Sequence, residues 1–275
     1  MRIKRYHEAP KSIFKEVQRI TDGDYALVHL FEDDQEYYNL FKQAVSSGRD
    51  VILDNSLFEL REAFDGDKYV KWIKDLQPTW FIVPDSWKDS EGTARKFFKF
   101  REDYPDLFRE DRTSKIIGVA QGMGLSDTIE CYEAIEPYCD MVAFNLQGEQ
   151  WWEDSTGKAS EGYITSMSRG RFNLIYAMND LGVINRDKPH HLLGTGLAAE
   201  ASWYVAANLD FIRSIDTSSP VACGMVKHKY SSAMGNTIKP DFKMCDAMDA
   251  RVSDSTFELI KYNIEIFDSF CGGSL

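Results

Sequence analysis

Short apolar runs alternate with longer amphipathic stretches along most of the chain. The apolar runs predict buried β-strands, and the amphipathic stretches predict helices, because apolar residues recur in them at helical spacing. The predicted strands are Tyr25–Phe31, Val51–Leu53, Trp80–Val83, Ile116–Ala120, Met141–Phe144, His191–Leu193 and Phe211–Ile215. The predicted helices are Gln35–Ser46, Asp67–Leu76, Glu91–Glu102, Leu125–Ile135, a helix within Tyr163–Leu181, Ala198–Asn208 and Ser255–Phe270. This alternation is typical of βα units and a parallel sheet.

The number of βα units favours an α/β fold of the (β/α)8 type, a TIM barrel, over an open sheet. Seven strands are visible, and we expect the eighth after Val221, in a degenerate last unit. The chain has 275 residues, close to the about 250 of such a barrel, so we expect a single domain spanning 1–275. An open doubly wound sheet is the structural alternative, but no glycine-rich dinucleotide-binding motif follows the first predicted strand.

Composition and charge narrow the class of protein. No apolar run approaches the ~18 residues that would span a bilayer, and none follows the basic N-terminus, so we expect a cytoplasmic protein without membrane contact. The chain has five cysteines without Cys-x-x-Cys spacing, which indicates reduced thiols and predicts no bound metal and no cofactor. The net charge of −12 argues against a simple nucleic-acid-binding surface, although an acidic protein can carry a local basic patch.

Polar residues follow the carboxyl ends of several predicted strands, where a barrel places its active site. Asp54, Asp85 and Asp216 follow three of these strands, and Gln121 and Asn145 follow two others. Each aspartate could instead cap a helix or shape a turn. Because all three occupy equivalent strand ends, we interpret them as active-site residues. Two carboxylates that face a sugar suit glycosidic chemistry, one as the nucleophile and the other as the acid and base.

Glycines and one long loop border the same strand ends. The glycines are Gly122, Gly148, Gly194 and Gly196. They either satisfy backbone conformations or let a flat ligand approach the main chain, and the two roles are compatible. The loop from Gly148 to about Thr165 contains Trp151-Trp152 and is either an active-site lid or an ordinary surface excursion. An amide and a third carboxylate beside the first two suit the donors and acceptors of a purine edge.

Six short motifs, in order along the chain, resemble those of the tRNA-guanine transglycosylase superfamily. They are Leu53-Asp54-Asn55-Ser56-Leu57-Phe58, Pro84-Asp85, Gly118-Val119-Ala120-Gln121-Gly122, Phe144-Asn145-Leu146-Gln147-Gly148-Glu149, His191-Leu192-Leu193-Gly194-Thr195-Gly196 and Ser214-Ile215-Asp216-Thr217-Ser218-Ser219-Pro220. The match extends from about residue 50 to 220, and its specificity comes from the order and the strand-end placement of the motifs. The family's Asp-Ser-Gly-Gly-Phe-Gln reads Asp-Asn-Ser-Leu-Phe-Glu at 54–59, so both glycines are replaced.

The resemblance implies a TIM-barrel pentosyltransferase that exchanges a base. By resemblance, Asp216 is the nucleophile that attacks C1′ and displaces guanine, and Asp54 is the acid and base for the incoming base. Asp85 and Gln121 would read the purine edge. The other implied substrate-binding residues are Phe58, Asn145, Gly148, Gly194 and Gly196.

The tRNA enzymes carry a C-terminal Cys-x-Cys-x-x-Cys…His zinc site, and the sequence has no such cluster, so we expect no C-terminal zinc subdomain. Together with the acidic charge, this makes the chain more similar to the compact phage and bacterial enzymes that insert 7-deazaguanines into DNA. We expect DNA as the polymer, tRNA as the alternative, and a free base such as 7-cyano-7-deazaguanine as the second substrate. In either polymer, the target base would have to leave its stack to reach the active site. The sequence leaves open whether the protein forms a homodimer or needs an accessory protein.

Basic residues after the seventh predicted strand and after the long loop are candidates for contact with the nucleic-acid backbone. They are Lys227, Lys229, Lys239, Lys243, Arg251, Arg169 and Arg171. Each also suits a solvated charged face, and Trp151-Trp152 suits either base stacking or lid packing. Two other functions stay open. The acidic charge motivates hydrolysis or transfer on a small nucleoside or sugar, and the altered turn after Asp54 motivates a non-catalytic binding subunit.

Overall fold

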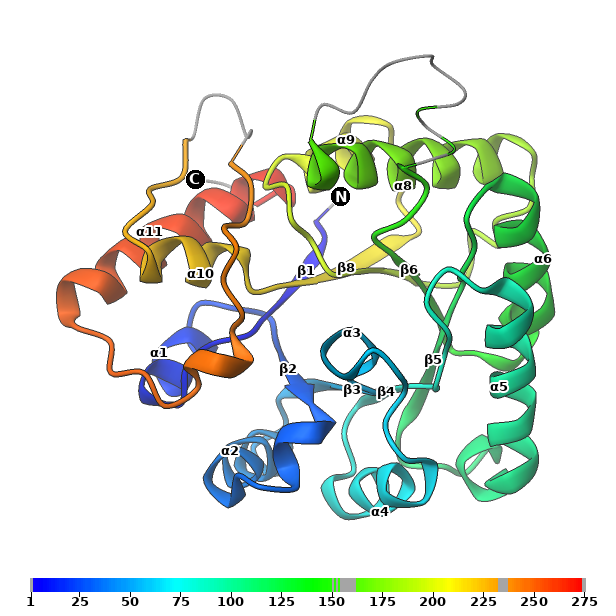
Figure 1. The fold of residues 1–275 in the computed structure, drawn as a ribbon, viewed down its shortest axis with the longest axis horizontal. Helices are drawn as coiled ribbons and strands as arrows, with labels where there is room; N and C mark the ends of the chain where they lie inside the picture. The colour runs from blue at the N-terminus through cyan, green and yellow to red at the C-terminus, as the bar shows by residue number, and fades with distance from the viewer. Residues whose placement is uncertain (1, 150, 152, 154–161, 232–236, 274–275) are drawn as a thin grey trace.

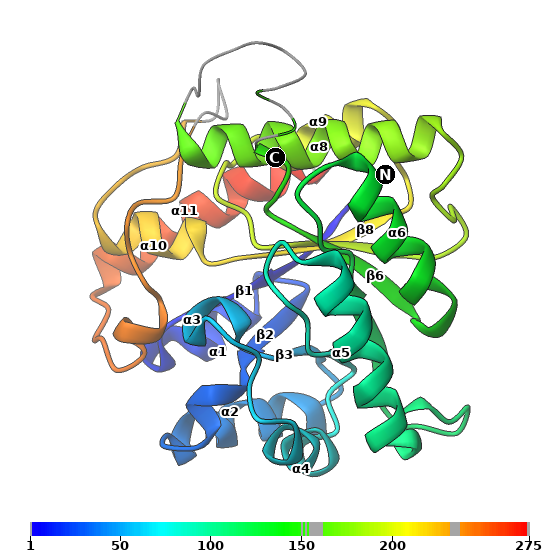
Figure 2. The same ribbon diagram turned by 45° about the vertical axis from the view of Figure 1, so that its right-hand side comes forward.

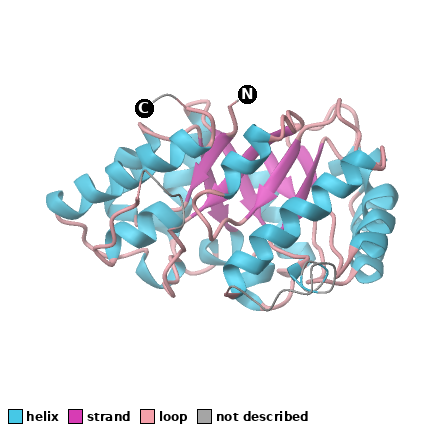
Figure 3. Ribbon diagram, turned by 90° about the horizontal axis from the view of Figure 1, so that it is seen from above, coloured by secondary structure: helices cyan, strands magenta, loops and turns pink. Residues whose placement is uncertain are grey.

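Eight parallel strands close into a barrel in chain order, with β1 paired to both β2 and β8. The structure, a computed structural model, describes residues 2–149, 151, 153, 162–231 and 237–273. The strands are β1 Lys4–His7, β2 Gly23–Leu27, β3 Asp50–Asp54, β4 Trp80–Ile82, β5 Lys115–Val119, β6 Met141–Asn145, β7 His190–Leu193 and β8 Ile212–Thr217. Figure 1 shows these strands inside a ring of helices, and Figure 3 shows the same arrangement from above. The predicted single-domain TIM barrel is confirmed.

Helices follow the strands and cover the outside of the barrel (Figure 2). They are α1 Phe14–Gln18, α2 Gln35–Ser46, α3 Leu57–Leu60, α4 Gly66–Leu76, α5 Ser90–Asp103, α6 Leu125–Ile135, α8 Tyr163–Asp180, α9 Glu200–Ala206, α10 Ser219–Met225 and α11 Asp254–Phe270. The helices α2, α4, α5 and α11 begin at a capping side chain. The side-chain oxygens of Asp34, Asp65, Asp89 and Ser253 each accept a hydrogen bond from the backbone N–H three residues later.

The barrel begins with a strand, β1, that precedes every predicted strand. With β1 the barrel closes at eight strands, so the prediction of an eighth strand after Val221 is wrong. The chain after β8 forms the helix α10 instead. Strand β1 reads Lys-Arg-Tyr-His and has no apolar run. Arg5 is nevertheless buried, because its guanidinium pairs with Asp22 at 2.9 Å and with Asp268 at 3.1 Å. A search for apolar runs therefore misses this strand.

The barrel has two hydrophobic clusters, one inside the ring of strands and one outside it. The inner cluster is formed by Tyr6, Tyr25, Leu27, Ile52, Ile82, Ile117, Val119, Met141 and Ala143. The larger outer cluster lies between the strands and the helices. Because successive strand residues point to opposite faces, a residue two positions beyond an inner residue also faces the barrel axis. Within the described residues, no helix combines the length and the apolarity that a membrane span requires.

Two other predicted segments differ from the structure or lie partly outside it. The predicted strand Tyr25–Phe31 is divided, because β2 ends at Leu27 and the next four residues form a 3-10 helix. Much of the predicted loop from Gly148 to Thr165, with Trp152, lies outside the described residues. Trp151 is described, and it packs half-buried against the outer cluster.

Candidate active site at the barrel mouth

The aspartates Asp54 and Asp216 both face the barrel axis at the carboxyl ends of their strands. Asp54 is the last residue of β3 and lies two positions after the inner residue Ile52. Asp216 lies two positions after Ser214, whose hydroxyl is 3.7 Å from the sulfur of the inner residue Met141. The two residues are 7% and 4% exposed, respectively. The structure thus brings the two predicted catalytic carboxyl groups to one edge of the barrel.

The surroundings of Asp54 favour its protonated form. Burial raises the pKa of Asp54 well above its ordinary value, and the negative charges of Glu59, Asp85 and Asp216 raise it further. The backbone N–H of Ser56 donates to Oδ2 at 2.8 Å and opposes this shift only in part. Asp54 therefore holds its proton to a higher pH than an exposed aspartate does, as a general acid requires.

One of the two oxygens of Asp216 is contacted by two nitrogen atoms. The imidazole Nε2 of His191 lies 2.9 Å from Oδ1, and the backbone N–H of Gly194 donates to the same oxygen at 2.8 Å. Among the described residues, none donates a hydrogen bond to Oδ2. This asymmetry leaves one carboxylate oxygen available for chemistry.

Four polar side chains from consecutive strand ends form a chain of hydrogen bonds. The amides of Asn55 and Gln121 donate to the two oxygens of Asp85, at 2.8 and 2.6 Å. The amide of Asn145 donates to the Gln121 carbonyl oxygen at 2.8 Å. Burial raises the pKa of Asp85, and the two amide donors oppose that rise. The residues predicted to read a purine edge are therefore adjacent, and the buried Oδ1 of Asn145 has no partner in the described part of the chain.

Two further carboxyl groups at the mouth were missed by the sequence analysis. Glu8 directly follows β1, and burial, opposed by Lys239, raises its pKa to about 8. Burial also raises the pKa of Glu59 in α3, and the charge of Asp216 adds to that rise. Glu8 was not predicted because the strand that it follows, β1, was not predicted. Glu59 replaces the glutamine of the family motif, and this departure could have identified it.

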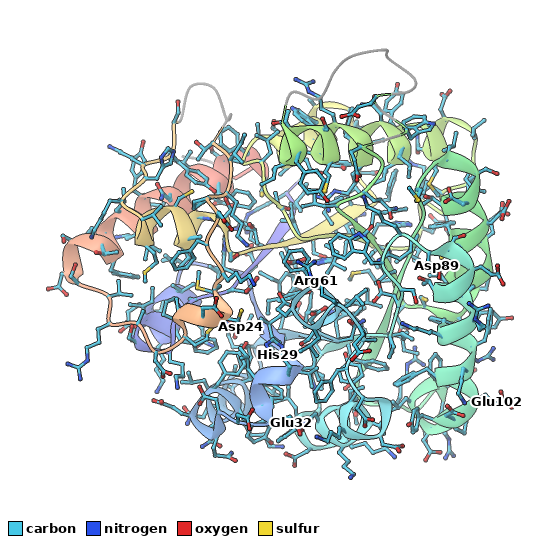
Figure 4. All side chains as sticks on the ribbon, in the orientation of Figure 1. Asp24, His29, Glu32, Arg61, Asp89 and Glu102 are labelled. Carbon is cyan, nitrogen blue, oxygen red and sulfur yellow. The ribbon has the colours of Figure 1, made fainter. Side chains whose placement is uncertain are left out.

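Phe58 lies on the short helix α3 and is 53% exposed. Its ring centroid is 5.4 Å from that of Trp87, and the guanidinium carbon of Arg61 lies 5.2 Å from its centroid. Arg61 lies near the centre of the ring of helices (Figure 4). Phe58 thus exposes an aromatic ring on the helix that follows β3, and its contact with a base stays a prediction.

Two of the predicted glycines have backbone conformations that favour glycine. Gly194 has φ of +68°, and its N–H is the second donor to Asp216. Gly148 has φ of +86° and packs against the backbone of Gly170 in α8. Gly196 lies against Ile164. Gly194 therefore has a direct role in the site, since its backbone supplies a hydrogen bond.

The basic residues predicted to contact nucleic acid fall into two groups. Arg171 is fully buried, pairs with Glu200 at 2.7 Å, and donates to the carbonyl oxygens of Phe144 and Leu193 at 3.1 and 2.9 Å. It joins the ends of β6 and β7, and it lacks the exposed surface that contact with a polynucleotide requires. The expectation for Arg171 is corrected accordingly: it lies on the buried face of α8, as its helical spacing from Leu174 allows.

The other basic residues keep their predicted role as a hypothesis. Lys227, Lys229 and Arg251 are exposed. The Lys227 ammonium contacts the hydroxyl of Thr256, and the Lys229 ammonium lies 4.2 Å from the centroid of the Tyr262 ring. Arg169 is half-buried, with its guanidinium carbon 5.6 Å from the Trp203 ring centroid.

In the described part of the chain, no three His, Cys, Asp or Glu side chains are grouped so that they could hold a metal ion. Two surface hollows of about 390 Å³ each border α2, and neither contains a candidate residue. No protein-family model matches the sequence, and a search of curated proteins finds no significant match. The candidate active site is therefore defined by the geometry of the barrel mouth.

Proposed function

We propose that the protein is a base-exchange transglycosylase, which replaces guanine in a polynucleotide with a free 7-deazaguanine through a covalent aspartyl intermediate. The observation that supports this most is the difference between two inward-facing carboxyl groups at one barrel edge. Asp54 is in surroundings that keep it protonated, whereas Asp216 accepts the N–H of Gly194 and lies 2.9 Å from Nε2 of His191, contacts that suit a carboxylate. One acid and one nucleophile are the groups that glycosidic bond exchange requires.

In the first half-reaction, Asp216 Oδ2 attacks C1′ of the target nucleotide. The bond from C1′ to N9 breaks, and its electron pair goes to the departing guanine. The Asp54 carboxyl group donates its proton to that base, so guanine leaves as a neutral molecule. The products are a sugar ester of Asp216 and an Asp54 carboxylate.

In the second half-reaction, the Asp54 carboxylate takes the N9 proton of the incoming 7-deazaguanine. N9 attacks C1′, and the bond from C1′ to Asp216 Oδ2 breaks. The electron pair returns to Asp216 as a carboxylate, and Asp54 is again protonated. Both carboxyl groups therefore end the cycle in the state in which they began it.

We propose DNA as the polymer and tRNA as the alternative, since the sequence lacks the zinc-binding cluster of the tRNA enzymes that it resembles. The incoming base would be a 7-deazaguanine such as 7-cyano-7-deazaguanine. The hydrogen-bonded side chains of Asp85, Gln121 and Asn145 carry amide and carboxyl groups that suit the edge of such a base, and the buried Oδ1 of Asn145 has no partner among the described residues.

The test is incubation of the purified protein with DNA or tRNA and a radiolabelled guanine or 7-deazaguanine. We expect label in one polymer with the wild-type protein and none with Asp216→Asn or Asp54→Asn. Asp187→Asn is the matched control, because Asp187 is exposed and precedes the amino end of β7, whereas the mouth is formed by the carboxyl ends of the strands. Label in neither polymer, or undiminished transfer by Asp216→Asn, would overturn the proposal.

A second candidate is hydrolysis of a small nucleoside. The net charge of −12 and the burial of Arg171 favour it, because both weaken attraction to a polyanion. Free guanine released from guanosine or deoxyguanosine in the absence of any polymer, with loss of release in Asp216→Asn, would favour this candidate over base exchange.

A further inference from the structure

We infer that His191 is a positioning residue for Asp216. By donating from Nε2 to Oδ1, it directs Oδ2 toward the sugar and stabilises the carboxylate that re-forms when the covalent intermediate breaks down. The role in the reaction rests on the proposed function, whereas the hydrogen bond can be tested without it.

A β-bulge places His191 at this position. Strand β7 pairs with β8 so that His190 lies opposite Ile212 and His191 lies opposite Ser214, with a register shift between the two histidines. The shift aligns His191 with the inward-facing Ser214 rather than with Arg213. Bulges of this kind commonly aim a side chain next to an active site.

The His191 ring is fixed on several sides. It is fully buried, its Nδ1 lies 2.8 Å from Ser214 Oγ, and its Nε2 lies 2.9 Å from Asp216 Oδ1. The Tyr6 ring packs edge-on against it, with the ring centroids 6.1 Å apart. A ring held in this way cannot turn without losing two hydrogen bonds, so its orientation and that of Asp216 are linked.

The two partners determine which ring nitrogen carries the donated proton. An ionised Asp216 only accepts hydrogen bonds, so Nε2 of His191 carries a hydrogen. Ser214 Oγ can either accept from Nδ1 of a charged ring or donate to Nδ1 of a neutral ring. The donor to Asp216 is present in both cases.

The asymmetric hydrogen bonding affects the two half-reactions differently. In the ester, Oδ2 is bonded to C1′ and Oδ1 is a carbonyl oxygen with little charge. When the bond to C1′ breaks, negative charge returns to the carboxylate, and the donors from His191 and Gly194 stabilise it. His191 should therefore matter most for the breakdown of the intermediate.

The crowding of carboxyl groups explains why such a donor is needed. Asp54, Glu59 and Glu8 surround Asp216 closely enough for its charge to raise the pKa of each. Each of these groups, when ionised, repels the negative charge that returns to Asp216 when the ester breaks down. A fixed N–H donor offsets this repulsion without introducing another acid.

The kinetic test compares His191→Leu, which removes the donor, with His191→Gln, which keeps an N–H at a similar distance. We expect His191→Leu to lower kcat about 100-fold, as is typical when one preorganised donor is lost. KM for the incoming base should stay unchanged, and the covalent protein–polymer adduct should accumulate in quenched reactions. His191→Gln should recover most of kcat.

His190→Gln is the matched control. His190 is equally buried and adjacent in β7, but it faces outward and stacks against Tyr132 and Phe144. We expect it to leave the partition between adduct and product unchanged. If His191→Leu and His190→Gln have the same kcat and the same adduct level, the positioning role is overturned.

A spectroscopic test does not depend on activity. The chain has five histidines, so ¹⁵N labelling of histidine gives few ring signals, and the His191 signals are those missing from His191→Gln. We expect Asp216→Asn to shift the His191 Nε2–H signal strongly. An unchanged signal overturns the hydrogen bond, and with it the inference. If the signal shifts but the protein modifies no polymer, the hydrogen bond is supported and only the proposed reaction is overturned.

Discussion

At the scale of single residues, the chemistry of the barrel mouth depends on what surrounds each carboxyl group. Burial raises the pKa values of Asp54, Glu59 and Glu8, whereas Asp216 is held by His191 and Gly194. These different surroundings suit the proposed roles of Asp54 as the acid and of Asp216 as the nucleophile.

The raised pKa of Glu8 predicts a pH dependence of stability. A folded-state pKa of about 8, above the unfolded value of 4.5, means that the folded protein binds this proton more tightly. This contribution is complete below about pH 4.5 and is lost as the pH rises to about 8. We expect Tm to fall over that window, and Glu8→Gln to reduce the fall. The exposed Glu133→Gln serves as the control. An equal fall of Tm in Glu8→Gln and wild type would contradict this reading.

The left-handed backbone at Gly194 predicts a second effect. Gly194→Ala should cost about 1–2 kcal/mol of stability, because φ is +68° although space is available. It should also reduce activity by moving the N–H that donates to Asp216. Gly182→Ala has the same kind of strain at φ of +72°, with open space around it, and should lose stability without losing activity. Thermal melts and the base-exchange assay measure the two effects, and loss of activity in both variants would count against the specific role of Gly194.

At the scale of elements, a buried ion pair joins helices to strand ends. Arg171 of α8 and Glu200 of α9 are both fully buried, and the Arg171 guanidinium also binds two carbonyl oxygens at the ends of β6 and β7. The pair therefore fixes the part of the barrel edge that carries Asn145 and Gly194.

Arg171→Met should destabilise the protein by about 3–5 kcal/mol, because it leaves the Glu200 carboxylate buried without its partner. The control is Arg186→Met, which breaks the half-exposed pair with Asp210 and should cost less than about 1 kcal/mol. Denaturant unfolding measures both values. Similar losses of unfolding free energy in the two variants would show that the buried ion pair stabilises the protein no more than the half-exposed one.

The sequence predicted elements where one physical rule dominates. Helices such as α2 and α11 could be predicted because apolar residues recur in them at helical spacing, and the structure adds the capping side chains Asp34 and Ser253 at their starts. Asp54 and Asp216 could be predicted because each follows an apolar run. β1 could not, since Arg5 is buried by ion pairs with residues far along the chain. Glu8 was not predicted because it directly follows that strand. The contact between His191 and Asp216 depends on a β-bulge, which no local sequence pattern predicts.

At the scale of the whole molecule, an acidic protein is proposed to bind a polyanion. The net charge of −12 opposes the approach of DNA at long range, so binding would depend on a few exposed cations. The exposed candidates are Lys227 and Lys229 after α10 and Arg251 before α11, and the half-buried Arg169 in α8 is a further candidate.

This predicts a shallow salt dependence of DNA affinity. Lys229→Ala should weaken binding equally for all sequences and reduce the slope of log affinity against log salt by about 1. Lys71→Ala, in the helix α4, is the control, and it should leave the slope unchanged. Fluorescence anisotropy with labelled DNA at several salt concentrations measures the slopes. An unaltered slope in Lys229→Ala would remove Lys229 from the binding surface.

The pairing of β1 with β8 determines when Asp216, the proposed nucleophile, can reach its place at the barrel mouth. His7 and Thr217 are partners although 210 residues separate them, and Tyr6 is the partner of Asp216 in the same ladder. During synthesis on the ribosome, β8 emerges long after β1 and completes the barrel only by pairing with it. A nascent chain that stops before β8 thus lacks a closed barrel, and Asp216 reaches its place at the mouth only after both strands have been made.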